Sequence, residues 1–168
     1  VPARDGVIVA AEPDIIFLAD RDEDGHAEVR EVLFTGFKVS MLERRINQPR
    51  WGPDNWIYAG RGRGGHITGP HLAAPVDLPS SDFRFKPDGS AIEPVTGGTA
   101  TIGWTFSGTG QRFVATTVTP GNYVAPVPWR YLARNQNVAL RGTHSQAADY
   151  QKVFQISKPH PWRLKRAN

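Results

Sequence analysis

Five of the six carboxylates between residues 20 and 31, together with one glycine, form the clearest chemical pattern in this chain. Counted from Asp20, the carboxylates occupy loop positions 1, 3, 5, 9 and 12, and a glycine occupies position 6. Calcium loops use this oxygen-ligand spacing, with a backbone carbonyl at position 7 as a further ligand. The sequence therefore predicts a calcium site whose members are Asp20, Asp22, Asp24, His26, Glu28 and Glu31.

The segments on either side of this loop are typical of strands. The short apolar run Asp14–Ala19 precedes it, and the β-branched segment Val29–Thr35 follows it. The loop is therefore predicted to connect a β-hairpin rather than the two helices of an EF-hand. An acidic turn that binds no metal fits the same residues, because Asp and Gly are ordinary turn residues. In that case Glu28 and Glu31 extend along the strand, away from the loop.

The composition limits the classes of protein and partner. The 168 residues suffice for one domain, and 20 basic against 16 acidic residues give a net charge of +4. The basic excess gathers near residues 158–166 without any nucleic-acid-binding motif, so no nucleic-acid partner is predicted. The absence of cysteine excludes disulfides and covalent c-type haem within this chain. No apolar run approaches the roughly 20 residues of a membrane helix.

Short β-type segments separated by turn signals dominate the chain, which contains 17 glycines and 14 prolines. The predicted strands are Gly6–Ala11, Asp14–Ala19, Val29–Thr35, Asn55–Gly60, Phe83–Phe85, Ala91–Val95, Gly103–Phe106 and Arg112–Thr117, with a late strand at Lys152–Ser157. Only Val39–Ile46 and Trp129–Asn135 offer short helical patterns. The predicted fold class is therefore all-β. Because the chain opens at Val1 almost directly into a strand, we expect it to be part of a longer protein.

A recurring sequence pattern favours a β-propeller. Turns such as Gly52-Pro53-Asp54 and Pro87-Asp88-Gly89 alternate with aromatic strands, as repeated blade hairpins do. Because a blade needs about four strands, residues 1–119 are predicted to form two to three blades of an open, partial propeller. Residues 120–168 are predicted to be a loop-rich extension of the same domain, a long irregular C-terminal excursion.

Several of these segments together resemble a known family. They are Gly6–Ala11, Asp20–Gly25, Val32–Phe37, Asn47–Tyr58, Phe83–Gly89, Gly103–Phe113, Tyr131–Asn135 and Val153–Pro159. In this order they resemble the propeller of the membrane-bound dehydrogenases of planctomycete-type bacteria, which are similar to sorbosone dehydrogenases and soluble quinoprotein glucose dehydrogenases. The resemblance implies a six-bladed propeller, a periplasmic or extracytoplasmic location, and pyrroloquinoline quinone as cofactor. It also implies a sugar or alcohol substrate and electron delivery to a haem-binding domain elsewhere in the full-length protein.

The Gly-rich segment Tyr58–His66 carries the cofactor prediction. Its arginines offer forked donors to carboxylates, and the resemblance implies that Arg61 and Arg63 bind the three carboxylates of the quinone. A solvated loop fits the same residues.

The catalytic residue is not assigned. The related glucose dehydrogenases carry a histidine shortly before the Gly-Pro-Asp turn, whereas residues 43–50 contain none; Glu43 is the acidic residue of that stretch. Two functions therefore stay open, namely a quinoprotein-like dehydrogenase or a non-catalytic propeller that binds carbohydrate or a protein partner.

Overall fold

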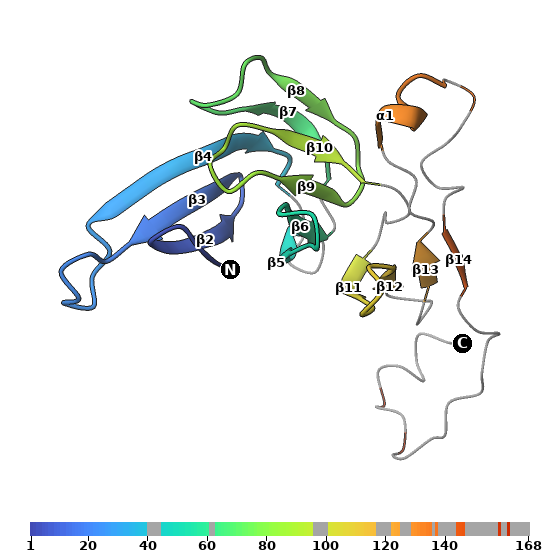
Figure 1. The fold of residues 1–168 in the computed structure, drawn as a ribbon, viewed down its shortest axis with the longest axis horizontal. Coiled ribbons are helices and arrows are strands. Elements are labelled where there is room, and N and C mark those ends of the chain that lie inside the picture. The colour runs from blue at the N-terminus through green and yellow to red at the C-terminus, as the bar shows by residue number, and fades with distance from the viewer. Residues whose placement is uncertain are drawn as a thin grey trace.

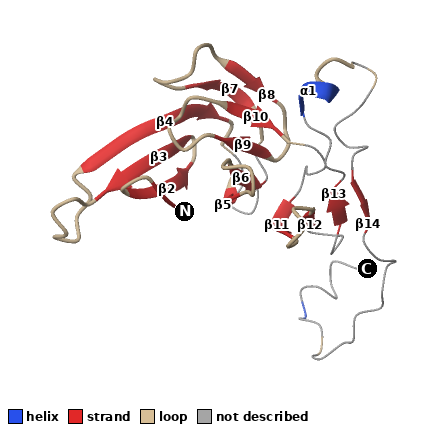
Figure 2. Ribbon diagram, viewed as in Figure 1, coloured by secondary structure: helices blue, strands red, loops and turns tan. Residues whose placement is uncertain are grey.

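Three open antiparallel sheets make up the fold (Figures 1 and 2). A computed structural model describes residues 1–39, 45–60, 63–95, 101–116, 122–124, 129–135, 137, 144–146, 158 and 161. The helix with described bounds is the four-residue α1 (Trp129–Leu132), and residue 161 is also helical. The prediction of an all-β, partial propeller-like fold is confirmed, since the sheets are antiparallel and none of them closes on itself.

The first sheet has six strands in the order β1-β2-β3-β4-β7-β8. Their bounds are β1 (Pro2–Ala3), β2 (Gly6–Ala11), β3 (Asp14–Ala19), β4 (Val29–Phe37), β7 (Gly65–Thr68) and β8 (Val76–Leu78). Side-chain alternation explains β2, where Ile8 is buried and its neighbours Val7 and Val9 are exposed. The long strand β4 pairs with β3 up to Phe34 and then with β7 from Thr35, so two smaller sheets share it.

The second sheet has the order β10-β9-β6-β5 and is interleaved with the first along the chain. Its strands are β5 (Asn47–Trp51), β6 (Ile57–Gly60), β9 (Phe83–Phe85) and β10 (Ile92–Pro94). The hairpin β7–β8 lies between β6 and β9 in sequence but belongs to the first sheet. The chain therefore passes from one sheet to the other and back, which ties the two together.

The third sheet is a four-stranded meander, the arrangement of a single propeller blade. It contains β11 (Thr101–Phe106), β12 (Arg112–Thr116), β13 (Asn122–Val124) and β14 (His144–Gln146), in chain order. Aromatic contacts join it to the second sheet: Tyr58 lies 6.0 Å from Trp104 and 5.1 Å from Phe106, measured between ring centroids.

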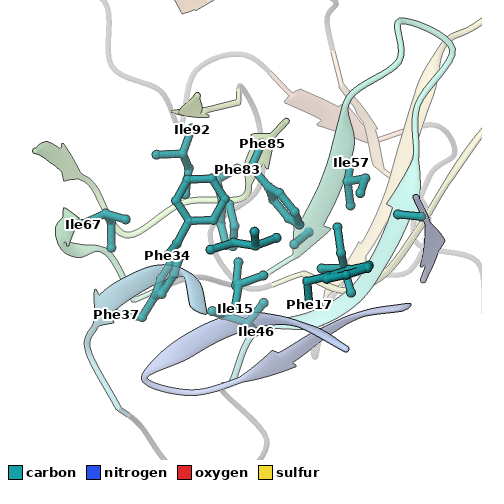
Figure 3. Packing of buried hydrophobic residues seen from close by; sticks show 14 of the residues in the cluster. Ile15, Phe17, Phe34, Phe37, Ile46, Ile57, Ile67, Phe83, Phe85 and Ile92 are labelled. Atoms are coloured by element: carbon teal, nitrogen blue, oxygen red, sulfur yellow. The ribbon is translucent and has the colours of Figure 1, made fainter. Parts of the chain in front are cut away.

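The main core lies between the first two sheets (Figure 3). Phe34 of β4 meets Phe85 of β9 edge to face at 5.6 Å, and Phe37 lies 5.3 Å from Phe83. The rings of Phe17, Phe34, Phe83 and Phe85 are fully buried. Burial of an aromatic side chain is worth about 2–3 kcal/mol at roughly 25 cal/mol per Å² of apolar surface. These rings therefore hold the two sheets face to face.

The predicted elements match the structure to different degrees. The bounds predicted for β2, β3 and β9 are those observed, whereas β4 extends two residues beyond Thr35 and β11 begins two residues before Gly103. Helix α1 covers the first part of the predicted Trp129–Asn135 segment. The strand predicted at 152–157, most of the C-terminal excursion and the centre of the helical pattern at 39–46 lie outside the described residues.

Candidate functional site

The acidic loop is the tip of the β3–β4 hairpin, which projects away from the body of the molecule (Figure 1). Carboxylate oxygens of Asp20, Asp22 and Glu28 all lie within 4.8 Å of one another. Three carboxylates at this spacing suit a hard divalent cation, whose other ligands are carbonyls and water. The hairpin connection predicted from the sequence is confirmed, and half of the six predicted ligands come together.

Hydrogen bonds within the loop fix this cluster. The backbone amide of Gly25 donates to Asp20 Oδ2 at 2.9 Å, and the amide of Arg21 donates to both Glu28 oxygens at 3.0 and 3.2 Å. Asp20 Oδ1 is shielded from solvent and has no hydrogen-bond partner in the described part of the chain. A buried carboxylate oxygen without a partner is costly, and a bound cation would satisfy it.

Two of the predicted ligands lie elsewhere. Asp24 Oδ1 accepts the backbone amide of His26 at 2.8 Å, so it caps the turn outside the cluster. Glu31 is the third residue of β4, and its carboxylate is bonded to Arg4 and His71. Because β4 is already extended at position 12 of the loop, Glu31 is carried away from Asp20 and Asp22. The sequence left open that both glutamates extend along the strand, away from the loop. The structure shows this for Glu31 and not for Glu28.

The predicted cofactor loop is shorter than the sequence indicates, because β7 begins at Gly65. Arg61 lies outside the described residues, and Arg63 is exposed with no hydrogen bond or ion pair to any described residue. The glycines serve the packing of strands. A Cβ on Gly64 would lie 2.2 Å from the carbonyl oxygen of Leu78, and one on Gly65 would lie 2.1 Å from that of Gly36. Of the predicted pair, only Arg63 is available to a carboxylate ligand in the described structure.

Arg63 stands at an end of the fold where six segments meet, here called the convergent end. The segments are the β2–β3 turn, the end of β4, the start of β5, the end of β6, the start of β7 and the start of β11. Phe37 donates its amide to the Pro13 carbonyl, and Lys38 donates to that of Gly64. The amide of Ile46 donates to Glu12 Oε1 at 2.6 Å. Asn47 pairs with Gly60, and its Nδ2 donates to the Thr101 carbonyl at 3.1 Å.

Two oxygens at the convergent end have unused hydrogen-bonding capacity. Glu12 Oε2 and Asn47 Oδ1 are both shielded from solvent and accept no hydrogen bond from the described residues. Buried acceptors of this kind are uncommon in folded proteins and require an explanation. A polar ligand that donates to them is one explanation.

The carboxylate of the Gly-Pro-Asp turn is bonded to neighbouring side chains. Asp54 Oδ2 accepts from the hydroxyl of Tyr58 at 2.9 Å and from Arg84 Nη1 at 2.5 Å. Burial raises the pKa of Tyr58, which keeps its hydroxyl protonated as a donor. Arg84 also binds Glu93 and lies over the ring of Trp56, so the turn is part of a structural network. The acidic residue Glu43 lies outside the described residues.

A further cluster of ionisable side chains was not predicted from the sequence. Glu31 Oε2 accepts from Arg4 Nη1 at 2.8 Å, and Glu31 Oε1 lies 2.8 Å from His71 Nε2. Together with Asp88 and Ser90 these side chains line a cavity of about 420 Å³. Arg4 and His71 are 27 and 40 residues from Glu31 along the chain, so no local spacing indicated the cluster.

This cluster predicts a contribution of Glu31 to stability that depends on pH. Hydrogen bonds from Arg4 and His71 hold the pKa of Glu31 below its ordinary value of 4.5. The stabilisation is therefore complete above about pH 4.5 and is lost as the pH falls through the lower folded-state value. For this partly exposed side chain we expect about 1 kcal/mol or less.

Urea unfolding of wild type and Glu31→Gln between about pH 7 and pH 3 checks this expectation. The variant should lose less stability on acidification than wild type. It should retain some slope, because hydrogen bonds from Ser90 also lower the pKa of Asp88. Parallel profiles for the two proteins would contradict the expected role of Glu31.

The fold and its sites define the class of protein as an all-β chain of open, blade-like sheets with an acidic hairpin tip and a convergent loop end. The chain matches the family described as "Domain of unknown function (DUF7133)" over residues 1–168, and it belongs to that family. No curated protein and no solved structure matches it. In the described ranges, no helix is long and apolar enough to cross a membrane.

Proposed function

We propose that this chain is the propeller portion of a quinoprotein-like dehydrogenase that oxidises a sugar or an alcohol. The observation that supports it most is the convergent end, which contains the exposed Arg63 and two shielded oxygens, of Glu12 and Asn47, that have no hydrogen-bond partner among the described residues. Loops gathered at one end of a rigid β-scaffold are a common setting for ligand sites. The family resemblance of the motif order adds to this support.

In this proposal Arg63, together with Arg61, holds carboxylates of pyrroloquinoline quinone. A guanidinium suits this task because it stays charged and presents paired donors to a carboxylate. The bound quinone would supply two-electron oxidation of the substrate. The proposal also includes a periplasmic or otherwise extracytoplasmic location and a haem-binding domain elsewhere in the full-length protein as the electron acceptor.

Quinone binding and dye reduction test the proposal. The protein is mixed with pyrroloquinoline quinone and calcium, and dye reduction is followed with aldoses and alcohols. Arg63→Ala should weaken quinone uptake by about tenfold or more, the loss of one charge-assisted contact. Arg30→Ala is the matched control, because Arg30 is also exposed but lies near the opposite end of β4. Saturable sugar binding without quinone uptake would contradict the proposed dehydrogenase function.

Calcium at the acidic tip is the second part of the proposal. Asp22→Asn should weaken calcium binding by roughly tenfold or more, because it removes one anionic ligand of three. Asp24→Asn is the matched control, since Asp24 lies in the same loop but outside the cluster and its amide oxygen can still accept from His26. Calorimetric titration and the calcium-dependent rise in Tm measure the effect. Equal calcium affinities of the two variants would contradict a calcium site at Asp20, Asp22 and Glu28.

A non-catalytic propeller that binds carbohydrate or a protein partner is the second candidate function. The engagement of Asp54 with Tyr58 and Arg84 favours it, because this carboxylate already serves the structural network of the turn. The lack of histidine in residues 43–50 points the same way. Under this function the sheets present a binding surface and the calcium loop contributes rigidity alone.

A further inference from the structure

The cavity lined by Arg4, Glu31, His71, Asp88 and Ser90, here called the polar pocket, lies at the opposite end of the same strands from the convergent end. Arg4 is in the β1–β2 turn, Glu31 is near the start of β4, and His71 follows the end of β7. Asp88 and Ser90 form the β9–β10 turn of the second sheet. The pocket is therefore built at the rim where the first two sheets meet.

We propose that the polar pocket binds a neutral polyhydroxylated molecule, a sugar or a sugar alcohol. The pocket is separate from the convergent end and needs no quinone. It deepens the second candidate function and rests on it, in that it gives a carbohydrate-binding module a specific site.

The chemistry of the lining selects the class of ligand. All five lining residues are polar, which disfavours an apolar molecule. The charge of Arg4 is balanced by Glu31, and Asp88 has Lys86 as a positive neighbour, so neither a polyanion nor a polycation is strongly favoured. Carboxylate acceptors alternate with guanidinium and hydroxyl donors. A hydroxyl group both donates and accepts, and neighbouring hydroxyls can therefore satisfy both kinds of group.

The pocket is organised before any ligand arrives. Glu31 is held by two partners on its two oxygens. Asp88 Oδ1 accepts the backbone amide of Ser90 at 3.0 Å and its hydroxyl at 2.6 Å, so the β9–β10 turn fixes this carboxylate. Because Nε2 of His71 is turned to Glu31, its Nδ1 is the ring atom left for a ligand. Side chains fixed in this way lose little freedom on binding.

The position of Arg4 adds an independent observation. Its backbone has φ of 57°, a left-handed conformation that glycine and asparagine adopt at lower cost. Its guanidinium lies 4.0 Å from the centre of the Phe17 ring, between the core and the cavity. A smaller residue would adopt this turn conformation with less strain. The contribution of Arg4 is therefore its side chain, which donates to Glu31 and lies over the Phe17 ring.

A metal ion is a poorer occupant of the same pocket. Among the described residues, only Asp20, Asp22 and Glu28 bring three ligand atoms within 4.8 Å of one another. Glu31, His71 and Asp88 do not meet that condition. The volume of about 420 Å³ also exceeds what an ion requires.

Titration of the protein with D-glucose, sorbitol and myo-inositol, followed by NMR shifts of backbone amides, tests the proposal. The pocket predicts saturable shifts at residues 4, 31, 71 and 88–90 for at least one probe. His71→Ala and Glu31→Gln should each raise Kd by about tenfold, the expected loss for one or two hydrogen bonds. His66→Ala is the matched control, because His66 forms a similar 2.7 Å pair with Asp77 outside the pocket.

Each outcome decides a different point. If no probe saturates the protein up to about 100 mM, a concentration far above the Kd of a useful site, the proposed ligand site in the polar pocket is contradicted. Saturation with equal Kd values in the His66 and His71 variants also overturns it, yet leaves a carbohydrate-binding function intact. Tighter saturation by citrate or spermidine than by the polyols refutes the neutral-ligand assignment. Quinone uptake is measured separately and is unaffected by these variants if the two ends are independent.

Discussion

Replacing Asp82 with alanine is expected to lower the free energy of unfolding by about 3–5 kcal/mol, because it removes a fully buried carboxylate that accepts hydrogen bonds from Arg112 and Thr101. Asp82 is fully buried and precedes β9, and Arg112 is 6% exposed and begins β12. Arg112 Nη2 donates to Asp82 Oδ2, and the Thr101 hydroxyl donates to the same oxygen at 2.8 Å. This carboxylate therefore joins the second sheet to the third.

Equilibrium unfolding in urea measures the loss, and a double-mutant cycle isolates its cause. Arg112→Met alone should also destabilise, since the buried Asp82 carboxylate then loses the charge-assisted hydrogen bond from Arg112. The double variant Asp82→Ala with Arg112→Met should be more stable than the sum of the single losses predicts, because the two groups interact directly and their interaction can be lost only once. Additive losses would contradict a coupled pair.

An exposed ion pair provides the control for this effect. Arg21 Nε lies 2.9 Å from Asp5 Oδ2, with the two side chains 58% and 52% exposed. Water screens such a pair and already solvates both charges, so Arg21→Ala should leave the unfolding midpoint almost unchanged. A loss at Arg21 comparable to that at Asp82 would mean that burial is not what makes the Asp82 pair important.

Alternation of apolar and polar residues was sufficient to predict several strands. It identified β9, where Phe83 and Phe85 are buried on either side of Arg84, whereas β2 and β3 were identified with their bounds as short apolar runs between turn residues. The edge strand β5 contains Pro49, and its register shifts between Asn47 and Arg50 so that the proline supplies no ladder bond. Such a strand has no clear local signal, and it forms because β6 pairs with it.

The candidate sites show the same division between local and long-range information. The cluster of Asp20, Asp22 and Glu28 was predictable, since its members lie in one short loop. The departure of Glu31 was not, because the start of β4 and its pairing with β3 decide where that carboxylate lies. The convergent end and the polar pocket each combine segments that only the pairing of distant strands brings together.

Gly65→Ala is expected to destabilise the fold by about 3 kcal/mol or more, whether or not any ligand is present. The Cβ would lie 2.1 Å from the carbonyl oxygen of Gly36, where β4 and β7 pair, so the backbone itself must move. Gly36 is the counterpart, because it has φ of 99° and its own Cβ would lie 2.2 Å from the His66 carbonyl oxygen.

Two further substitutions separate a structural role of Gly65 from a role in cofactor binding. Gly25 also has a positive φ, of 89°, but no atom lies within 4 Å of its Cβ position, so Gly25→Ala should cost only about 1 kcal/mol of conformational strain. Arg63→Ala should leave the urea midpoint unchanged, because Arg63 is exposed. If Gly65→Ala instead kept wild-type stability and lost quinone uptake, the glycine would serve the ligand and not the strand pairing. The expected order, with Gly65 far more costly than Gly25 or Arg63, assigns the glycine to the β4–β7 contact and leaves the arginine as the group that a cofactor could use.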